Sequence, residues 1–191
     1  MRQEQLKELF KKNNALLTGH FKLSSGLHSD TYFQSALILQ HPTKAAKLAE
    51  ELAEKIRENN IEIDVVVSPA MGGVIIGHEM GRALGTSAIF TERVDGNVAL
   101  RRGFFVNDGE RVLVVEDVIT TGLSTREVID SLKSSGAKVV AIVSLVDRSV
   151  GKIDFGIPRY SLLSLEVKNY KEEECPMCKN GSIAIKPGSR K

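Results

Sequence analysis

Four short apolar runs rich in valine and isoleucine limit most strongly what this chain can fold into. They stand at 65–67, 88–90, 112–115 and 139–145. Such short, continuous runs are typical of strands buried on both faces of a parallel sheet. Helical patterns lie between several of them, at 73–84 and 124–134. This alternation predicts an α/β fold with a doubly wound, mostly parallel sheet that binds ligands at the carboxyl ends of its strands.

The segments before and after this region do not continue the alternation of apolar strands and helices. Apolar residues at helical spacing from Leu6 to Leu17 predict an opening amphipathic helix that ends near Gly19. A second helix is expected to begin at Pro42, because proline is tolerated in the first turn. The 191 residues fit a single domain, 1–191, that closes with an edge strand or two and a tail at 170–191.

Charge and composition exclude several classes of partner. The formal net charge is +2 and no block of lysine and arginine stands out, so no nucleic-acid partner is expected. The first fourteen residues are charged throughout, unlike a signal peptide, and no run approaches the roughly 18 apolar residues of a membrane span. We therefore expect a cytoplasmic protein that does not contact membranes.

The segment from Arg111 to Ser124, RVLVVEDVITTGLS, carries the clearest chemical signal. An apolar strand ends in two carboxylates, Glu116 and Asp117, and a hydroxyl-rich turn then opens a helix. The backbone N–H groups and positive dipole end of such a turn suit a phosphate, and Gly122 allows close approach. The carboxylates can accept hydrogen bonds from sugar hydroxyls, so the string predicts a site for a phosphorylated sugar.

Simpler and competing interpretations of this segment exist. An acidic strand end followed by a capped helix would explain a shorter string of this kind. The phosphate-binding alternatives are absent from the sequence, since neither G-x-x-x-x-G-K-[ST] nor G-x-G-x-x-G occurs.

The string VLVVEDVITTG resembles the phosphoribosyl pyrophosphate signature of type I phosphoribosyltransferases. This resemblance implies the type I phosphoribosyltransferase fold with a small N-terminal hood, here residues 1–40. It also implies a set of residues that bind the donor: Glu116, Asp117, Val118, Ile119, Thr120, Thr121, Gly122, Leu123, Ser124 and Arg93.

Two further segments resemble the orotate phosphoribosyltransferase family. FKLSSGLHSDTYFQ, residues 21–34, is similar to the family's hood, although composition alone would suit an ordinary loop. The strand end Leu145 to Arg148 is similar to the place where the family has an arginine beside the orotate carboxylate, which a guanidinium can pair through two hydrogen bonds. The residues implied for orotate are Thr120, Arg148, Tyr32, Phe33 and Lys22.

Two loops complete the implied site. The turn Ala70, Met71, Gly72 and Gly73 resembles the family's pyrophosphate loop, where a cis peptide bond would fall at Ala70-Met71. Residues 92–105 correspond to a flexible loop that closes over the leaving pyrophosphate, often with lysine and histidine side chains. This chain offers only arginines there, and we expect Arg101 or Arg102 to act.

The resemblance implies Mg²⁺-dependent transfer of ribose 5-phosphate from phosphoribosyl pyrophosphate to orotate. The products are orotidine 5′-phosphate and pyrophosphate, and the chain is expected to form a homodimer with shared active sites. A transition state like an oxocarbenium ion calls for Mg²⁺ and cations on the leaving group and for a carboxylate near the ribose. Asp117 is the expected carboxylate.

Other readings remain open. The segment IDFGIP, 153–158, is reminiscent of the base-binding segment of hypoxanthine-guanine enzymes. A regulator that senses phosphoribosyl pyrophosphate without catalysis would need a nucleic-acid-binding face that the sequence does not reveal. Cys175 and Cys178 could be half of a zinc site completed by a second subunit, a redox pair, or part of a turn.

Overall fold

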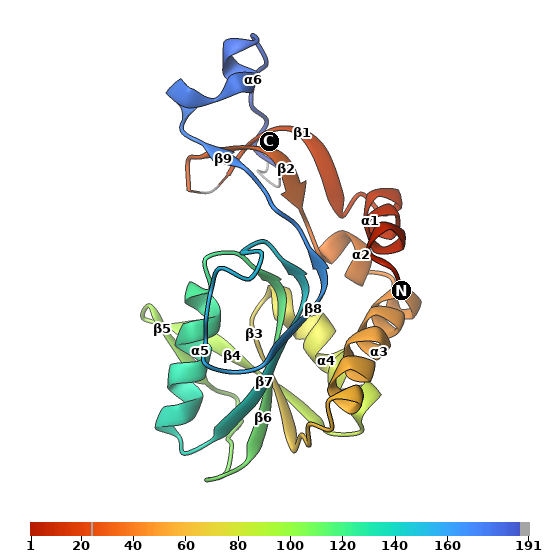
Figure 1. Cartoon of the computed structure of the whole chain (residues 1–191). Helices are drawn as coiled ribbons and strands as arrows, with labels where there is room; N and C mark the ends of the chain where they lie inside the picture. Colours follow the sequence, from red (N-terminus) through yellow and green to blue (C-terminus); the bar gives the residue numbers. More distant parts are fainter. Residues whose placement is uncertain (24, 188–191) are drawn as a thin grey trace.

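A six-stranded sheet forms the centre of the molecule in the computed structural model, which describes residues 1–23 and 25–187 (Figure 1). Ser24 of the expected hood and residues 188–191 of the expected tail lie outside the described residues. The strand order is β5-β4-β3-β6-β7-β8, and every neighbouring pair is parallel except β4 with β5. The sheet is therefore mostly parallel, as predicted.

The elements follow one another along the chain with short connections. The helices are α1 (Gln3–Lys12), α2 (Ala36–Leu39), α3 (Pro42–Glu58), α4 (Gly72–Leu84), α5 (Leu123–Ser134), the 3₁₀ helix η1 (Glu172–Glu174) and α6 (Pro176–Lys179). The strands are β1 (Leu16–Lys22), β2 (His28–Phe33), β3 (Val65–Pro69), β4 (Ser87–Val94), β5 (Asn97–Leu100), β6 (Arg111–Ile119), β7 (Lys138–Asp147), β8 (Arg159–Ser164) and β9 (Asn169–Tyr170).

Helices cover both faces of the sheet, which explains the continuous apolar runs. Leu113 and Val115 of β6 pack into the core beneath α3 and α4, whereas Val112 and Val114 pack into the core beneath α5. Side chains of a strand alternate between faces, so a strand covered on both sides must be apolar at every position. The prediction of a doubly wound α/β fold is confirmed.

Glycines let α4 lie close to the sheet. A Cβ on Gly77 would lie 2.4 Å from Ser68 Oγ, and one on Gly81 would lie 2.7 Å from Ala88 Cβ. Both separations are shorter than any van der Waals contact allows, so a larger residue would push the helix away. The glycine spacing therefore serves packing of α4 on β3 and β4.

The first helix is shorter than the sequence predicts. It ends at Lys12, and Asn14 then adopts a positive φ of 54°. The expected helical end near Gly19 is wrong, because Leu16 begins β1, which pairs with β2. Leu16 and Leu17 fall at helical spacing by coincidence, and hydrogen bonding to β2 decides their conformation.

A small second sheet forms the hood above the main sheet (Figure 1). Its order is β1-β2-β9, with antiparallel pairing throughout, so the hood draws its third strand from the tail. Ile185 adds a bridge to Phe21 on the other edge. Among the described residues, none of the helices is both long and apolar enough to span a bilayer.

The strand order places a crevice between β3 and β6. The chain passes from β3 outward to β4 and β5, then returns to the opposite side of β3 with β6. At such a switch point the loops after the two neighbouring strands turn to opposite faces and leave a ligand-binding crevice. Here these loops are 70–71 and 120–122.

Candidate active site

The loop after β6 forms a pocket of about 250 Å³ at the start of α5. Gly122 adopts a φ of 74°, and a Cβ there would lie 2.9 Å from the ring of Phe155, so both conformation and space require glycine. The hydroxyls of exposed Thr120, Thr121 and Ser124 border the pocket. The lining residues are Arg93, Glu116, Val118, Ile119, Thr120, Thr121, Gly122, Leu123, Ser124 and Thr125. A helix N-terminus with exposed hydroxyl residues suits a phosphate.

Glu116 lies at the inner wall of this pocket and is 4% exposed. Its Oε1 accepts a hydrogen bond of 2.9 Å from Thr125 Oγ1. Burial raises the pKa of Glu116 to about 7, Asp117 next to it adds to the rise, and the Thr125 hydrogen bond opposes it. The carboxyl group is thus poised to exchange its proton near neutral pH.

Asp117 lies where three segments meet: the end of β6, the segment before α2 and the loop after β3. Ser35 Oγ donates a short hydrogen bond to Asp117 Oδ2, and the backbone N–H of Val118 donates to Oδ1 at 2.8 Å. A Cβ on Gly72 would lie 2.6 Å from Oδ2, so glycine is needed where the loop after β3 passes this carboxylate. The side chain is half-buried and held in one orientation.

The loop after β3 has the geometry that the sequence predicts. The Ala70-Met71 peptide bond is cis, and the Ala70 N–H donates to Thr91 O at 2.8 Å. Gly72 and Gly73 then begin α4, and a Cβ on Gly73 would lie 3.0 Å from Val115 O. This loop therefore presents a second helix N-terminus to the crevice, beside Asp117.

A larger cavity of about 470 Å³ lies between the hood and the loop after β6. Its lining residues are Leu23, Ser25, Leu27, Tyr32, Thr120, Thr121, Arg148, Val167 and Asn169. Thr120 and Thr121 border this cavity and also the phosphate pocket. One ligand could therefore extend from the pocket into the cavity.

Arg148 is the cation of this cavity. Its backbone N–H donates to Ile119 O at 2.8 Å, which fixes the end of β7 beside the loop after β6. Within the described part of the chain, no carboxylate forms an ion pair with its guanidinium. Burial lowers the pKa of Arg148 from its usual value. A half-buried cation without an internal partner suits a carboxylate ligand.

The neighbouring Asp147 has a structural position instead. It is 4% exposed and pairs with Arg159 at 3.3 Å. Its Oδ1 also accepts hydrogen bonds from the N–H and hydroxyl of Ser149. These contacts shape the turn that carries Arg148.

The residues expected from the hood separate into two groups. Tyr32 lines the cavity, but Phe33 packs edge-on against Phe10 with ring centroids 5.1 Å apart. Adjacent strand residues point to opposite faces, so Phe33 belongs to the core. Lys22 lies outside the cavity lining and forms an ion pair with Glu172 at 3.4 Å. Phe33 and Lys22 are thus not among the residues that line this cavity.

The predicted loop 92–105 is partly a β-hairpin, because β4 continues to Val94 and pairs with β5. Its arginines differ in their contacts. Arg93 pairs with Glu127 beside the phosphate pocket, and Arg102 pairs with Glu92 through bonds of 3.0 and 2.8 Å. The side chain of Arg101 is exposed and forms no ion pair or hydrogen bond with the described residues, whereas its backbone oxygen accepts a hydrogen bond of 2.8 Å from Phe104 N–H.

Sequence reasoning missed the residues that hold or complete the site. Ser35 orients Asp117, Thr125 orients Glu116, and Val167 and Asn169 form one wall of the larger cavity. Single serine, threonine and asparagine residues give no sequence signal of this kind. In the segment IDFGIP, Ile153 and Phe155 lie against Gly122. Ile153 also lines a pocket that includes Thr120 and Arg148.

Comparisons with known proteins agree with this geometry. The family model described as "Phosphoribosyl transferase domain" matches residues 35–176. The orotate phosphoribosyltransferase of Carboxydothermus hydrogenoformans is 55% identical over 186 residues, with 97% of each chain covered. That of Heliobacterium modesticaldum is 52% identical over 190 residues, with 100% of each covered. The crystal structure of orotate phosphoribosyltransferase from Aeropyrum pernix is 27% identical, with a TM-score of 0.70 over 84% of this chain and 94% of that one.

Proposed function

The chain belongs to the orotate phosphoribosyltransferase family. On this basis we propose which of its residues bind the substrates and which stabilise the transition state. The reaction transfers ribose 5-phosphate from phosphoribosyl pyrophosphate to orotate. The bond from the ribose C1 to the pyrophosphate oxygen breaks and its electron pair leaves with pyrophosphate, while a ring nitrogen of orotate forms the new bond to C1. The observation that carries the proposal is the cavity that joins the phosphate pocket to an unpaired Arg148.

The 5′-phosphate of the donor occupies the pocket after β6. Backbone N–H groups at the start of α5 and the hydroxyls of Thr120, Thr121 and Ser124 donate hydrogen bonds to its oxygens. Arg93 lies at the rim of the pocket and adds positive charge. The leaving pyrophosphate extends toward the loop 70–73, where Gly72 lets the donor approach Asp117.

Asp117 is the residue that acts closest to the reacting carbon. Its carboxylate accepts hydrogen bonds from the ribose hydroxyls and stabilises the positive charge that develops on the sugar. Ser35 and the Val118 N–H hold it in place, so little reorganisation is needed in the transition state. Glu116 is further inside and binds a ribose hydroxyl from the wall of the phosphate pocket.

The residues present fit a magnesium ion held mainly by its substrate. Asp117 is the accessible carboxylate of the crevice, and Glu116 lies 4% exposed behind it. Mg²⁺ keeps several waters and substrate oxygens as ligands and takes few from the protein. When bound, it would neutralise charge on the leaving pyrophosphate.

Orotate occupies the larger cavity with its carboxylate toward Arg148. The guanidinium can donate two parallel hydrogen bonds, Tyr32 borders the flat ring, and Thr120 lies between base and phosphate. The ring nitrogen of orotate is acidic without help, so the protein supplies position and charge.

The lid is the hairpin β4-β5 with the turn after it, and Arg101 is its catalytic cation. Arg93 and Arg102 are occupied by Glu127 and Glu92, whereas Arg101 is free to reach the leaving pyrophosphate. We propose that it does so in the active site of a second subunit of a homodimer. A cytoplasmic location, as the composition predicts, remains part of this proposal.

A steady-state assay tests the assignment. Phosphoribosyl pyrophosphate and Mg²⁺ are supplied with orotate, uracil, hypoxanthine, guanine or adenine in turn, and nucleotide formation is followed. We expect turnover with orotate alone, because only orotate carries a carboxylate for Arg148. Turnover with a purine would contradict the base site proposed here, and donor binding without turnover would favour a sensor.

A further inference from the structure

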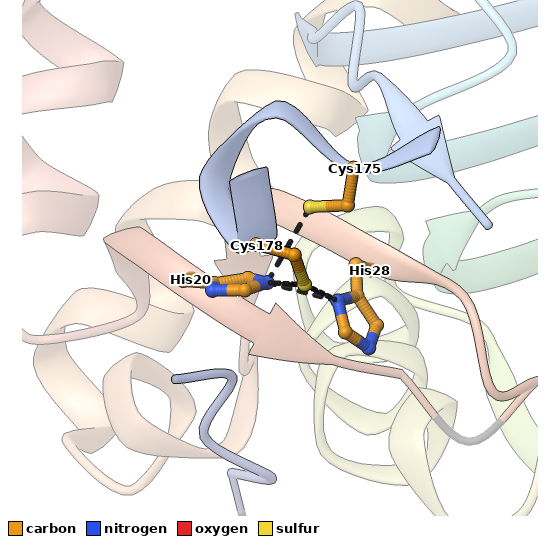
Figure 2. A group of neighbouring side chains, drawn as sticks. All are labelled: His20, His28, Cys175 and Cys178. Atoms are coloured by element: carbon orange, nitrogen blue, oxygen red, sulfur yellow. Dashed lines mark hydrogen bonds between the residues drawn. The ribbon is translucent and has the colours of Figure 1, made fainter. Parts of the chain in front are cut away.

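Four side chains that the reaction does not use meet inside the hood (Figure 2). They are His20 of β1, His28 at the start of β2, and Cys175 and Cys178 of the tail. One ligand atom from each lies within 4.8 Å of all the others. The two histidines are 6% and 2% exposed and Cys175 is fully buried. The sequence analysis considered the cysteines alone and did not connect them to these histidines.

Local features of the hood and tail bring the four side chains together: a bulge in β1, the pairing of β2 with β9, and the single turn of α6. The pairing of β1 with β2 shifts by one residue between Thr18 and Phe21, a bulge that turns His20 toward the tail. His28 pairs with Tyr170 of β9 across the hood sheet. Cys175 precedes α6, a single turn that returns Cys178 to the same side.

The spacing of the ligand atoms suits one tetrahedral ion. His20 Nε2 lies 2.9 Å from His28 Nδ1, 3.5 Å from Cys175 Sγ and 3.7 Å from Cys178 Sγ. Cys178 Sγ lies 3.2 Å from His28 Nδ1. A tetrahedral zinc ion with two nitrogen and two sulfur ligands spaces these atoms roughly 3.3–3.8 Å apart. No two of the four ligand atoms lie more than 4.8 Å apart, so shifts of about 1 Å or less in these side chains would give the ideal arrangement.

The outer nitrogens of both histidines also have surroundings typical of metal ligands. His20 Nδ1 lies 3.1 Å from Ser182 O, so it carries the proton and leaves Nε2 to point its lone pair into the cluster. His28 Nε2 is buried, has no hydrogen-bond partner among residues 1–23 and 25–187, and lies 3.8 Å from a carboxylate oxygen of Glu172. A carboxylate beside the outer nitrogen of a ligating histidine raises its basicity.

We propose that His20, His28, Cys175 and Cys178 of one chain bind a structural zinc ion. Two thiolates and two imidazoles in a tetrahedron select zinc over hard cations such as magnesium, which prefer oxygen ligands. All four positions are filled by protein, so no place is left for a water or a substrate and the ion is structural. A second subunit is not needed, in contrast to the half site considered from the cysteines alone.

The ion would hold the tail against the hood and thereby shape the orotate cavity. The tail contacts both edges of the hairpin β1-β2: β9 pairs with β2, and Ile185 exchanges hydrogen bonds of 2.8 Å with His20 O and Lys22 N. Val167 and Asn169, just before and within β9, line the cavity opposite Arg148. Loss of the ion should thus weaken orotate binding without removing any group that contacts the donor.

Metal analysis of the purified chain is the direct test. The protein is produced in zinc-supplemented medium, purified with reductant and passed over a chelating column. We expect about one zinc per chain by mass spectrometry of the metal. Apo protein titrated with Co²⁺ should develop intense visible bands and a thiolate-to-metal charge-transfer band, which zinc then abolishes.

Variants assign the ligands. His28→Ala and Cys178→Ser should each reduce the zinc content at least about tenfold, whereas His78→Ala, a histidine exposed on α4, should keep it. The wild-type Co²⁺ spectrum needs no variant, so it decides the question even if a variant fails to fold. Wild-type protein that holds no stoichiometric zinc and gives no charge-transfer band would overturn the proposal. Retention of zinc by both ligand variants would do the same.

Discussion

Two adjacent carboxylates, Glu116 and Asp117, lie in unlike surroundings at the end of β6. Glu116 points inward, is 4% exposed and contacts Thr125. Asp117 is half-buried and faces Ser35 and the loop after β3. The strand alternation sends them to opposite sides. In the proposed mechanism, Glu116 therefore borders the phosphate pocket and Asp117 faces the reacting sugar.

Glu116 should make the free protein less stable as the pH rises. Its pKa is raised to about 7 in the folded state, so the folded state holds the proton more tightly than the unfolded state. The stability this provides is present below about pH 4.5 and is lost as the pH rises to about 7. Glu116→Gln cannot lose a proton, so its free energy of unfolding at pH 8 should exceed that of wild type by up to about 3 kcal/mol, and it should unfold at a higher temperature.

Thermal unfolding at pH 5 and pH 8 without substrate measures this difference. The gain from Glu116→Gln should shrink at pH 5, while the exposed Glu54→Gln should show no such pH dependence. An equal effect of Glu116→Gln at both values would mean that this carboxyl group titrates normally.

Asp117→Asn should reduce kcat by about 10²–10³-fold, because the amide removes the negative charge opposite the developing sugar cation. The side chain keeps its size and can still accept the Ser35 hydrogen bond, so the fold should persist. The matched control is Asp130→Asn on the exposed face of α5. Near-normal turnover of Asp117→Asn would remove this carboxylate from the mechanism.

Arg148→Ala should raise the KM for orotate about 10- to 100-fold, the effect of losing hydrogen bonds to a charged ligand group. The KM for phosphoribosyl pyrophosphate should change little, because the donor pocket does not include this side chain. Arg82→Ala, which removes an exposed arginine of α4, controls for general loss of charge. An unchanged orotate KM would refute the role of Arg148.

Sequence reasoning identified most of these residues because they follow directly after apolar strands. The phosphate loop after β6 and the turn 70–73 lie where the strands predicted them, and Tyr32 lines the larger cavity. Phe33 and Lys22 do not line it, since their direction depends on strand pairing in the hood that periodicity did not reveal. The roles of Cys175 and Cys178 stayed open in the sequence, and only the fold shows that His20 and His28 meet them.

At the scale of elements, the central strands and helices were predictable and the hood was not. Strands covered on both faces must be largely apolar, so β3, β6 and β7 can be recognised in the sequence as continuous apolar runs. The hood strands are short and partly exposed, and β1 contains a bulge that disrupts its alternation. The pairing of β2 with β9, more than a hundred residues later, gives no local signal in the sequence.

In the lid hairpin, catalysis should depend more on Arg101 than on its neighbour Arg102. Arg101→Ala should lower kcat by about 10- to 100-fold, because it removes a charge-assisted contact to the leaving pyrophosphate. Arg102→Ala should have a smaller effect, since Arg102 is already paired with Glu92. Steady-state rates at saturating substrates compare the two variants, and the reverse order would assign the lid to Arg102.

At the scale of the whole molecule, an active site shared between subunits predicts complementation: two inactive variants should regain activity when they form a mixed dimer. When the Asp117→Asn and Arg101→Ala chains are co-expressed, half of the dimers should be mixed, and each mixed dimer contains one intact site. Activity should recover to about a quarter of wild type. Activity equal to the mean of the two parents would show that each lid closes over its own subunit.

The hood is built from the two ends of the chain, with β1 bordered by Ile185 and β2 by β9. A ribosome releases β1 and β2 long before it has made residues 169–185. All six strands of the main sheet, and with them the phosphate pocket after β6, precede this segment. We therefore expect a growing chain to be able to bind phosphate before it can recognise a base, so that selection of the acceptor is the last property the molecule acquires during its synthesis.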